Sequence, residues 1–134
     1  GEKTQVNIPI RIPTDQILES YFRKNDLALA SELTVAAQIY FDREGNSEKA
    51  LQSISESIRL MEDNLSFEEW LQNTDTENRS LPYRYFLKSK ILHDLGKKEE
   101  AIKAAERSLL IAQKIENKYF INANTEHINQ WKME

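Results

Sequence analysis

The chain reads Gly-Asn-Ser-Glu-Lys-Ala-Leu from Gly45 to Leu51, and Gly-Lys-Lys-Glu-Glu-Ala-Ile from Gly96 to Ile102, 51 residues later. The correspondence continues through Ser57-Ile58 and Ser108-Leu109. In each copy a glycine separates two stretches of helical periodicity, and glycine readily adopts the left-handed conformation in which helices end. The small alanine five residues later allows the two helices to pack closely. The sequence therefore predicts two copies of a helical hairpin.

The composition fits one domain of 134 residues, because 40% of them are hydrophobic and can form a core. The formal net charge is −4, and basic residues are scattered among acids, which argues against a nucleic-acid partner. No run of about 18 apolar residues occurs, so we expect no membrane span. The chain has no cysteine, which excludes disulfides and thiolate chemistry.

Residues 3–12 differ from the rest, because Val6, Ile8, Ile10 and Ile12 alternate with polar residues or proline. A period of two predicts a half-buried β-strand. No second strand can be read downstream, so this strand needs a partner in an upstream domain or in a second copy of the chain. The alternative is an extended arm that lies over the helices.

From Thr14 onward the pattern is helical. It predicts helices over residues 14–25, 27–43, 47–61, 82–95, 97–116 and 118–132, with Asp26 and Ser47 as N-caps of the second and third. Between the helices predicted over residues 47–61 and 82–95, Ser66-x-x-Glu69 is a capping box that predicts a short helix through Trp70. We expect Trp70 to cover the hairpins rather than to project as an anchor for a partner.

The second copy resembles the tetratricopeptide repeat, through Tyr85, Ser89, Leu92, Gly96, Ala101 and Ser108-Leu109. The first copy resembles it through Thr34, Phe41, Gly45, Ala50 and Ser57-Ile58. The family repeats about every 34 residues, and the longer offset here is accounted for by Ser66–Ser80. The resemblance implies an all-α, right-handed superhelix, with repeats at about 27–61 and 82–115, an insert at 62–81 and a capping helix at 118–132.

The beginning of the chain adds a second resemblance. Glu2-Lys-Thr-Gln-Val6-Asn-Ile-Pro-Ile10, two such repeats and a Trp131-Lys132 ending are together similar to the C-terminal half of certain uncharacterised exported bacterial proteins. Those proteins carry an N-terminal β domain of unknown function. The likeness implies that residues 1–13 are the last strand of such a domain. It also implies an extracytoplasmic location, in the periplasm or cell envelope.

Tetratricopeptide arrays bind partners on the concave side formed by the first helix of each hairpin. The resemblance places these positions at Glu32, Val35, Ile39, Asp42, Tyr83, Phe86, Lys90 and His93. Their mixture of apolar, aromatic and charged groups suits a peptide or protein segment. Val35 and Ile39 stand where some family members hold a C-terminal carboxylate, so that clamp is not reproduced. The alternative is that several of these residues belong to the core, covered by the flanking helices.

No catalytic, metal or cofactor site is predicted. His93 lies at the end of a helix, where a cation complements the helix dipole, and His127 is expected to face solvent or a partner. Neither histidine has the spacing of metal ligands. The leading hypothesis is a non-enzymatic module that binds a protein or peptide. The alternatives are an accessory domain for an absent enzymatic or carbohydrate-binding β domain, and a homodimer joined through the N-terminal strand.

Overall fold

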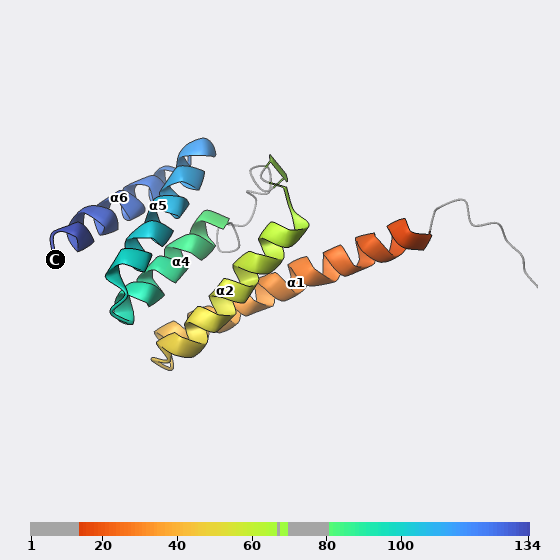
Figure 1. Ribbon diagram of the computed structural model, residues 1–134, viewed down its shortest axis with the longest axis horizontal. Helices are drawn as coiled ribbons and strands as arrows, with labels where there is room; N and C mark the ends of the chain where they lie inside the picture. Colours follow the sequence, from red (N-terminus) through yellow and green to blue (C-terminus); the bar gives the residue numbers. More distant parts are fainter. Residues whose placement is uncertain (1–13, 67, 70–80) are drawn as a thin grey trace, which may run out of the picture.

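The computed structural model describes residues 14–66, 68–69 and 81–134 (Figure 1). These residues form helices α1 (Thr14–Asp42), α2 (Ser47–Asn64), α4 (Leu81–Asp94), α5 (Lys98–Lys114) and α6 (Lys118–Lys132). No strand occurs in this described part of the chain. The prediction of a helical fold is therefore confirmed there, and α6 has the predicted bounds. The strand predicted over residues 3–12 lies outside the described residues.

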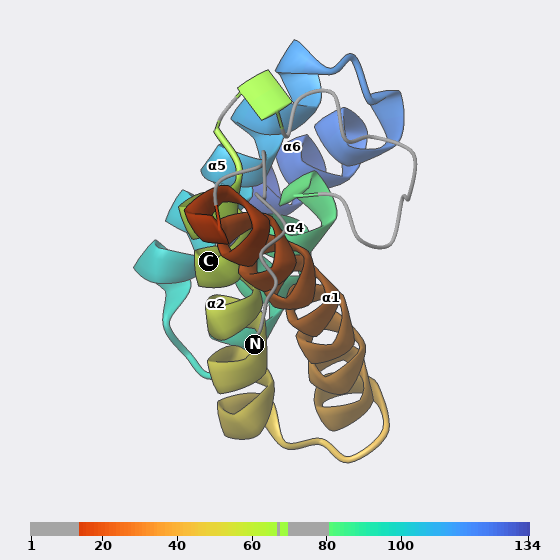
Figure 2. The same cartoon turned by 90° about the vertical axis from the view of Figure 1, so that its right-hand side faces the viewer.

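The helices pack as hairpins in chain order (Figures 1 and 2). Helix α1 packs along α2, and α4 packs along α5. The two hairpins meet mainly where α2 contacts α4, and α6 then packs on α5 and touches α4. The amino-terminal part of α1 extends beyond α2, and Figure 1 shows it projecting from the rest of the molecule.

The hairpin turns have the predicted left-handed glycines, because φ is +62° at Gly45 and +79° at Gly96. After Gly96, the Lys97 N–H donates to the Leu92 carbonyl at 2.9 Å and closes the end of α4. The turn between α5 and α6 closes in the same way without a glycine. There Glu116 has φ of +58°, and the Asn117 N–H donates to the Ala112 carbonyl at 2.9 Å.

These turns predict substitution effects of opposite sign. A left-handed residue with a side chain costs roughly 1–2 kcal/mol. Gly96→Ala is therefore expected to lower the free energy of unfolding by about 1 kcal/mol, although nothing lies within 4 Å of the new methyl group. Glu116→Gly is expected to raise it by about 0.5–1 kcal/mol, less than the full relief because glycine also loosens the unfolded chain. Urea titration of both variants measures these changes, and equal signs would contradict the reasoning.

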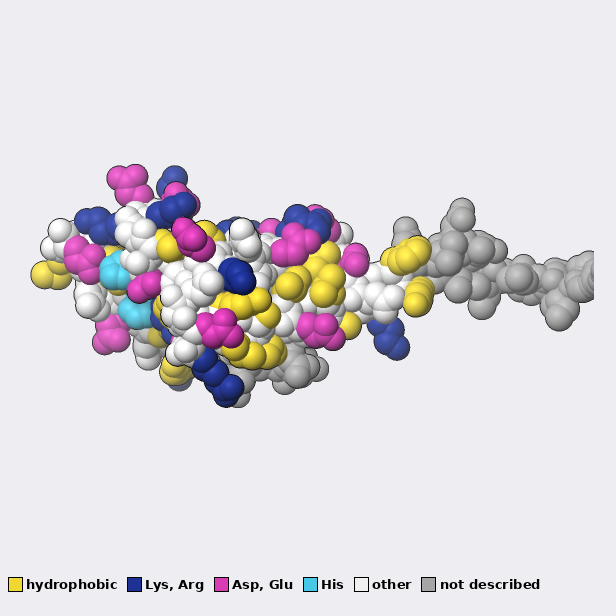
Figure 3. Space-filling view, turned by 90° about the horizontal axis from the view of Figure 1, so that it is seen from below, with side chains coloured by type: hydrophobic (Ala, Val, Ile, Leu, Met, Phe, Trp, Pro, Cys, Tyr) yellow, Lys and Arg dark blue, Asp and Glu magenta, His cyan; other side chains and the backbone are white. Residues whose placement is uncertain are grey.

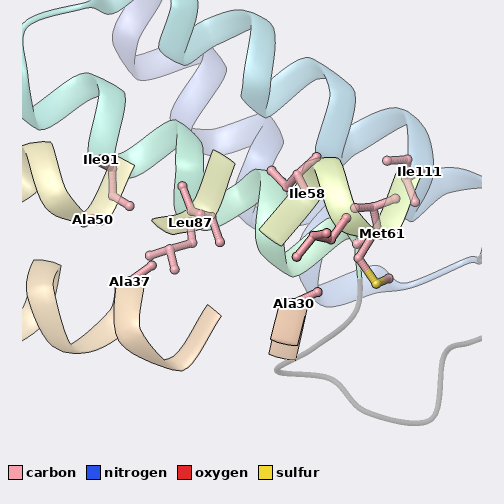
Figure 4. Packing of buried hydrophobic residues seen from close by; sticks show 11 residues of the cluster. Ala30, Ala37, Ala50, Ile58, Met61, Leu87, Ile91 and Ile111 are labelled. Carbon is pink, nitrogen blue, oxygen red and sulfur yellow. The ribbon is translucent and has the colours of Figure 1, made fainter. Parts of the chain in front are cut away.

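The predicted close packing at the repeated alanines is confirmed, since Ala50 and Ala101 are both fully buried. Around them lie two groups of apolar side chains. One joins the hairpins and includes Ala30 and Ala37 of α1, Ile58 and Met61 of α2, Leu87 and Ile91 of α4, and Ile111 of α5 (Figure 4). The other joins α4, α5 and α6 through Leu92, Ala105, Ile128 and Trp131.

The repeated serines make equivalent hydrogen bonds in the two hairpins. The Ser57 hydroxyl donates to the Ala30 carbonyl at 2.6 Å, and the Ser108 hydroxyl donates to the Pro82 carbonyl at 2.6 Å. Each serine oxygen also accepts from the next helix along the chain. Arg84 Nε donates to Ser57 Oγ at 2.9 Å, and Asn124 Nδ2 donates to Ser108 Oγ at 2.8 Å. The internal repeat is thus visible in polar contacts as well as in packing.

The predicted helix break at residues 25–27 is wrong. Helix α1 runs without interruption through Asn25 and Asp26, where a break was expected. No glycine or proline lies between Thr14 and Asp42, and Asn or Asp inside a helix costs only up to about 0.7 kcal/mol. Asp26 is not an N-cap but accepts a hydrogen bond from Asn64 Nδ2 at 3.2 Å. Hence the expected first flanking helix is the amino-terminal part of α1.

The N-cap of α2 is Asn46 rather than Ser47, because the Asn46 side chain accepts from the Lys49 N–H at 3.1 Å. The predicted capping box is confirmed. The Ser66 N–H donates to Glu69 Oε1 at 2.9 Å, and the Glu69 N–H donates to Ser66 Oγ at 3.2 Å. Trp70 lies outside the described residues.

Candidate functional site

The candidate groove residues of α1 lie on the surface. Glu32 and Asp42 are exposed, and between them Val35 is 46% and Ile39 is 37% exposed. The last two are one helical turn apart, so their side chains form one apolar strip along the helix. Figure 3 views a side of the molecule on which hydrophobic side chains gather near the middle and both histidines are visible.

Helix α4 borders this strip through Tyr83. The Gln38 side chain of α1 donates a hydrogen bond to the Tyr83 hydroxyl, which joins the two helices on this side. Burial raises the pKa of Tyr83, although the bond from Gln38 acts in the opposite direction. The phenol therefore stays protonated at neutral pH, and its hydroxyl holds α4 beside α1.

Phe86 is a core residue rather than a groove residue. Its side chain is 7% exposed, and its ring lies 5.4 Å from those of Phe120 and His127 on α6. The cause is α6, which covers this part of α4. The alternative considered for the groove, that some candidates are buried by a flanking helix, is therefore correct for Phe86. Lys90, one turn further on, is half-buried and places its ammonium group 4.8 Å from the centre of the Phe86 ring.

The two histidines and Trp131 belong to a continuous stack of rings between α4 and α6. The order of the stack is Phe86, His127, Trp131 and His93. The ring centres are 5.4, 4.7 and 4.5 Å apart, and each pair is within 15° of parallel. We call these four residues the ring stack. Trp131 is thus held between two imidazoles, and His127, expected at a solvent- or partner-facing position, is partly exposed and stacked between two rings.

The outer histidine of the ring stack has a polar partner, and the inner one has a buried nitrogen without a partner. His93 Nε2 lies 3.0 Å from a carboxylate oxygen of Glu134, just after α6. His127 Nδ1 is buried and has no hydrogen-bond partner. Burial lowers the pKa of His127, and the positive charge of Lys90 lowers it further. His127 is therefore neutral at pH 7.

A shallow hollow of about 280 Å³ lies beside the ring stack. It is lined by Phe41, Lys90, His93, Asp94, His127, Gln130 and Trp131. Phe41 belongs to α1, so the hollow is lined by residues of α1, α4 and α6. Among the groove candidates, those of α1 are exposed, whereas Phe86 is buried and Tyr83, Lys90 and His93 are partly buried.

The described residues offer no centre for metal chemistry, because they contain no group of three or more histidine or acidic side chains placed to hold an ion. None of the helices in this part of the chain is long and apolar enough to cross a membrane. What the site presents instead is an apolar strip with charged residues on both sides, a surface suited to binding.

Comparisons with protein-family models, with curated proteins and with solved structures give no match to this chain. A function for this chain is therefore inferred from the geometry described above.

Sequence reasoning missed the buried side chain of Arg84, which is 1% exposed and donates from Nε to Thr34 Oγ1 at 2.8 Å as well as to Ser57. An arginine on a helix is normally expected at the surface. The ring stack was missed too, although His127 and Trp131 are four residues apart and share a face with Phe120 and Asn124. That spacing was the available signal.

Proposed function

We propose that this domain is a non-catalytic module that binds a peptide or protein segment along α1 and α4. The proposal rests on the exposure of Val35 and Ile39. These two large apolar side chains remain open to solvent on the side where α1 borders α4. Polar residues at these two positions would leave the core intact, because neither Val35 nor Ile39 packs into it. Their exposure beside half-buried aromatic and basic groups is typical of a surface that a partner covers.

The charges around the strip indicate what such a segment would carry. Glu32 and Asp42 precede and follow the strip on α1, and Lys90 of α4 lines the hollow to which α1 contributes Phe41. A segment with one or two apolar side chains would cover Val35 and Ile39. A basic residue at one position and an acidic residue at another would then meet these charges, which would set the direction of binding more than its strength.

The binding test uses a displayed library of random peptides selected on the domain. Val35→Glu combined with Ile39→Glu is expected to abolish recovery of the selected peptides, because the strip becomes charged. Leu110→Glu is the matched control, since Leu110 is 43% exposed on α5 and belongs to neither α1 nor α4. Phe86 is left unchanged because it is buried. Circular dichroism checks that each variant stays folded, and peptides that bind the double variant as well as the control would contradict the proposal.

The proposed architecture is a tetratricopeptide-like superhelix of two repeats with α6 as its cap. The buried alanines, the left-handed glycine turns and the equivalent serine bonds support it. An extracytoplasmic location and membership of an exported bacterial family remain predictions from resemblance. Fusing the parent protein to a reporter enzyme that is active only outside the cytoplasm would test them.

A second candidate function is that of an accessory domain for an upstream β domain. It is favoured by Tyr21 and Phe22, which are 54% and 60% exposed on the part of α1 that extends beyond α2 (Figure 1). Two adjacent exposed aromatic residues near residues 1–13 are placed to pack on whatever precedes them. Tyr21→Ser with Phe22→Ser would then weaken the attachment of the two domains in the longer protein, measured by limited proteolysis.

Self-association through residues 1–12 is the remaining alternative. It predicts a dimer that becomes monomeric when residues 1–12 are deleted.

A further inference from the structure

The ring stack joins α4 and α6, next to a second contact in which Phe120 of α6 meets Tyr83 and Phe86 of α4. Each helix contributes two rings to the stack: Phe86 and His93 of α4 lie at its two ends, and His127 and Trp131 of α6 lie between them. Away from the stack, α6 packs mostly on α5. Anything that disturbs the stack would therefore loosen α6 from the first helix of the second hairpin.

The surroundings of His127 favour its neutral ring. Its Nδ1 is buried without a partner, and the charged, doubly protonated ring would have an N–H at this nitrogen with no acceptor for it. The charged groups that face it add to the conflict. From α4 these are Lys90 and His93, both of which disfavour a positive His127, and from α6 the neighbour is Glu126, which favours it. The exposed carboxylate of Asp94, also on α4, lines the same hollow and accepts a hydrogen bond from the Ser47 hydroxyl. Glu126 is exposed, so water screens its charge.

We propose that the ring stack is an acid-sensitive latch, which holds α6 on α4 at neutral pH and releases it when His127 becomes protonated. This inference goes beyond the proposed binding function and does not depend on it. No ligand is needed, because the titrating group and everything it opposes belong to this chain.

One interaction works against the latch. The face of an indole attracts cations, so Trp131 would stabilise a charged His127 to some extent. However, Trp131 has an imidazole on each face, and Lys90 lies over the next ring of the same stack. The attraction of the indole is therefore shared between two rings, and the Lys90 ammonium repels a charged His127. Burial of the unpartnered Nδ1 adds to that repulsion. Protonation of His127 is therefore expected to favour the state in which α6 is released from α4.

The direction of the pH dependence follows from linkage. His127 has a lower pKa when α6 is docked than when it is free. Above the ordinary histidine pKa of about 6.5, both states are neutral and docking is at full strength. As the pH falls through 6.5, only the released state takes up the proton readily, so docking weakens. At pH 5.5 a free His127 is protonated about ten to one, which limits the gain in α6 opening between pH 7.5 and 5.5 to about tenfold.

Amide hydrogen exchange measures this opening directly. Protection factors, which correct for the intrinsic effect of pH on exchange, would be compared at pH 7.5 and 5.5 for residues 118–132. Residues 47–64 of α2 serve as the internal reference. We expect the protection of α6 to fall severalfold at pH 5.5, up to the tenfold limit, while that of α2 changes little, because carboxylates remain ionised at both pH values.

Two matched variants separate the histidines. His127→Phe keeps an aromatic ring in the stack but cannot titrate, so the acid-dependent loss of protection should disappear. His93→Phe replaces the other imidazole but keeps His127, so it should retain the loss. Comparing the two pH values within each variant cancels any change in basal stability. An equal loss in His127→Phe and in the wild-type chain, or no loss in the wild-type chain, would overturn the latch.

A measurement on the unsubstituted chain covers the case in which His127→Phe does not fold. The pKa of His127 can be followed by the NMR shift of its ring Cε1 proton between pH 4 and 8. The latch requires a pKa below the ordinary value, together with line broadening or shifts of α6 signals over the same pH range. A His127 that titrates at or above 6.5 would exclude it, whether or not the domain binds peptides.

Discussion

Replacing Leu87 by alanine is expected to lower the free energy of unfolding by about 2–5 kcal/mol, the range for large-to-small changes in protein cores. Leu87 is 1% exposed and lies on α4 within the cluster that joins the two hairpins (Figure 4). The cavity left behind would border α1 and α2 as well as α4, so the hairpins cannot close it without shifting relative to each other. Chemical denaturation followed by circular dichroism measures the change.

Leu110→Ala is the matched control for Leu87→Ala. Leu110 undergoes the same chemical change on α5, but it is 43% exposed, and we expect an effect within about 0.5 kcal/mol. If both substitutions had the same small effect, α4 would not be packed between the hairpins. The arrangement of helices described above would then be wrong.

The second large effect is expected for Trp131→Ala, which should weaken the docking of α6 by about 3–5 kcal/mol. Trp131 is buried, contributes to the cluster shared by α4, α5 and α6, and lies between two imidazoles. Because α6 is the last helix, the loss should appear first as local unfolding. Amide exchange of residues 118–132 should become fast while residues 47–64 keep their protection.

Trp131→Phe is the control for this substitution, since it preserves a ring between the histidines and should cost clearly less. Retained protection of α6 in Trp131→Ala would show that the ring stack does not hold this helix. That result would also remove the basis of the acid-sensitive latch.

The features predicted correctly from the sequence are those with a local physical cause. Glycine at positions 45 and 96 is favoured by a left-handed turn, and the structure has positive φ at both. Ala50 and Ala101 are the residues that allow close helix contact, and both are fully buried. The Ser66–Glu69 capping box needs only four consecutive residues, and it forms. Such signals do not depend on what the rest of the chain does.

The features predicted wrongly depend on tertiary contacts. Asp26 is an acceptable N-cap in isolation, but within the fold it binds Asn64 and α1 continues. The helix predicted over residues 97–116 ends at Lys114, because Glu116 takes a left-handed conformation in the turn into α6. Phe86 was a groove candidate, yet α6 covers it. In each case the deciding neighbour is distant in the sequence or lies on another helix.

Sequence reasoning could not tell which groove candidates are open and which are covered. Val35 and Ile39 are open because no helix packs over that part of α1 in the described chain. His93 was assigned to the end of its helix, where it does lie, but its stacking on Trp131 depends on the docking of α6. Which candidates are exposed therefore depends on how the two hairpins and α6 pack together.

The central claim is that two helical hairpins, each with a buried alanine where its helices pack, stack on one another, with α6 closing the second. Methyl NOE spectroscopy on a chain labelled at Ala, Ile and Leu methyl groups tests it most directly. We expect cross-peaks between the hairpins, linking Leu87 and Ile91 of α4 to methyl groups of the shared cluster on α1 and α2, such as Ala37 and Ala50. Methyl groups of Ala50 and Ala101 that contact only water would contradict it.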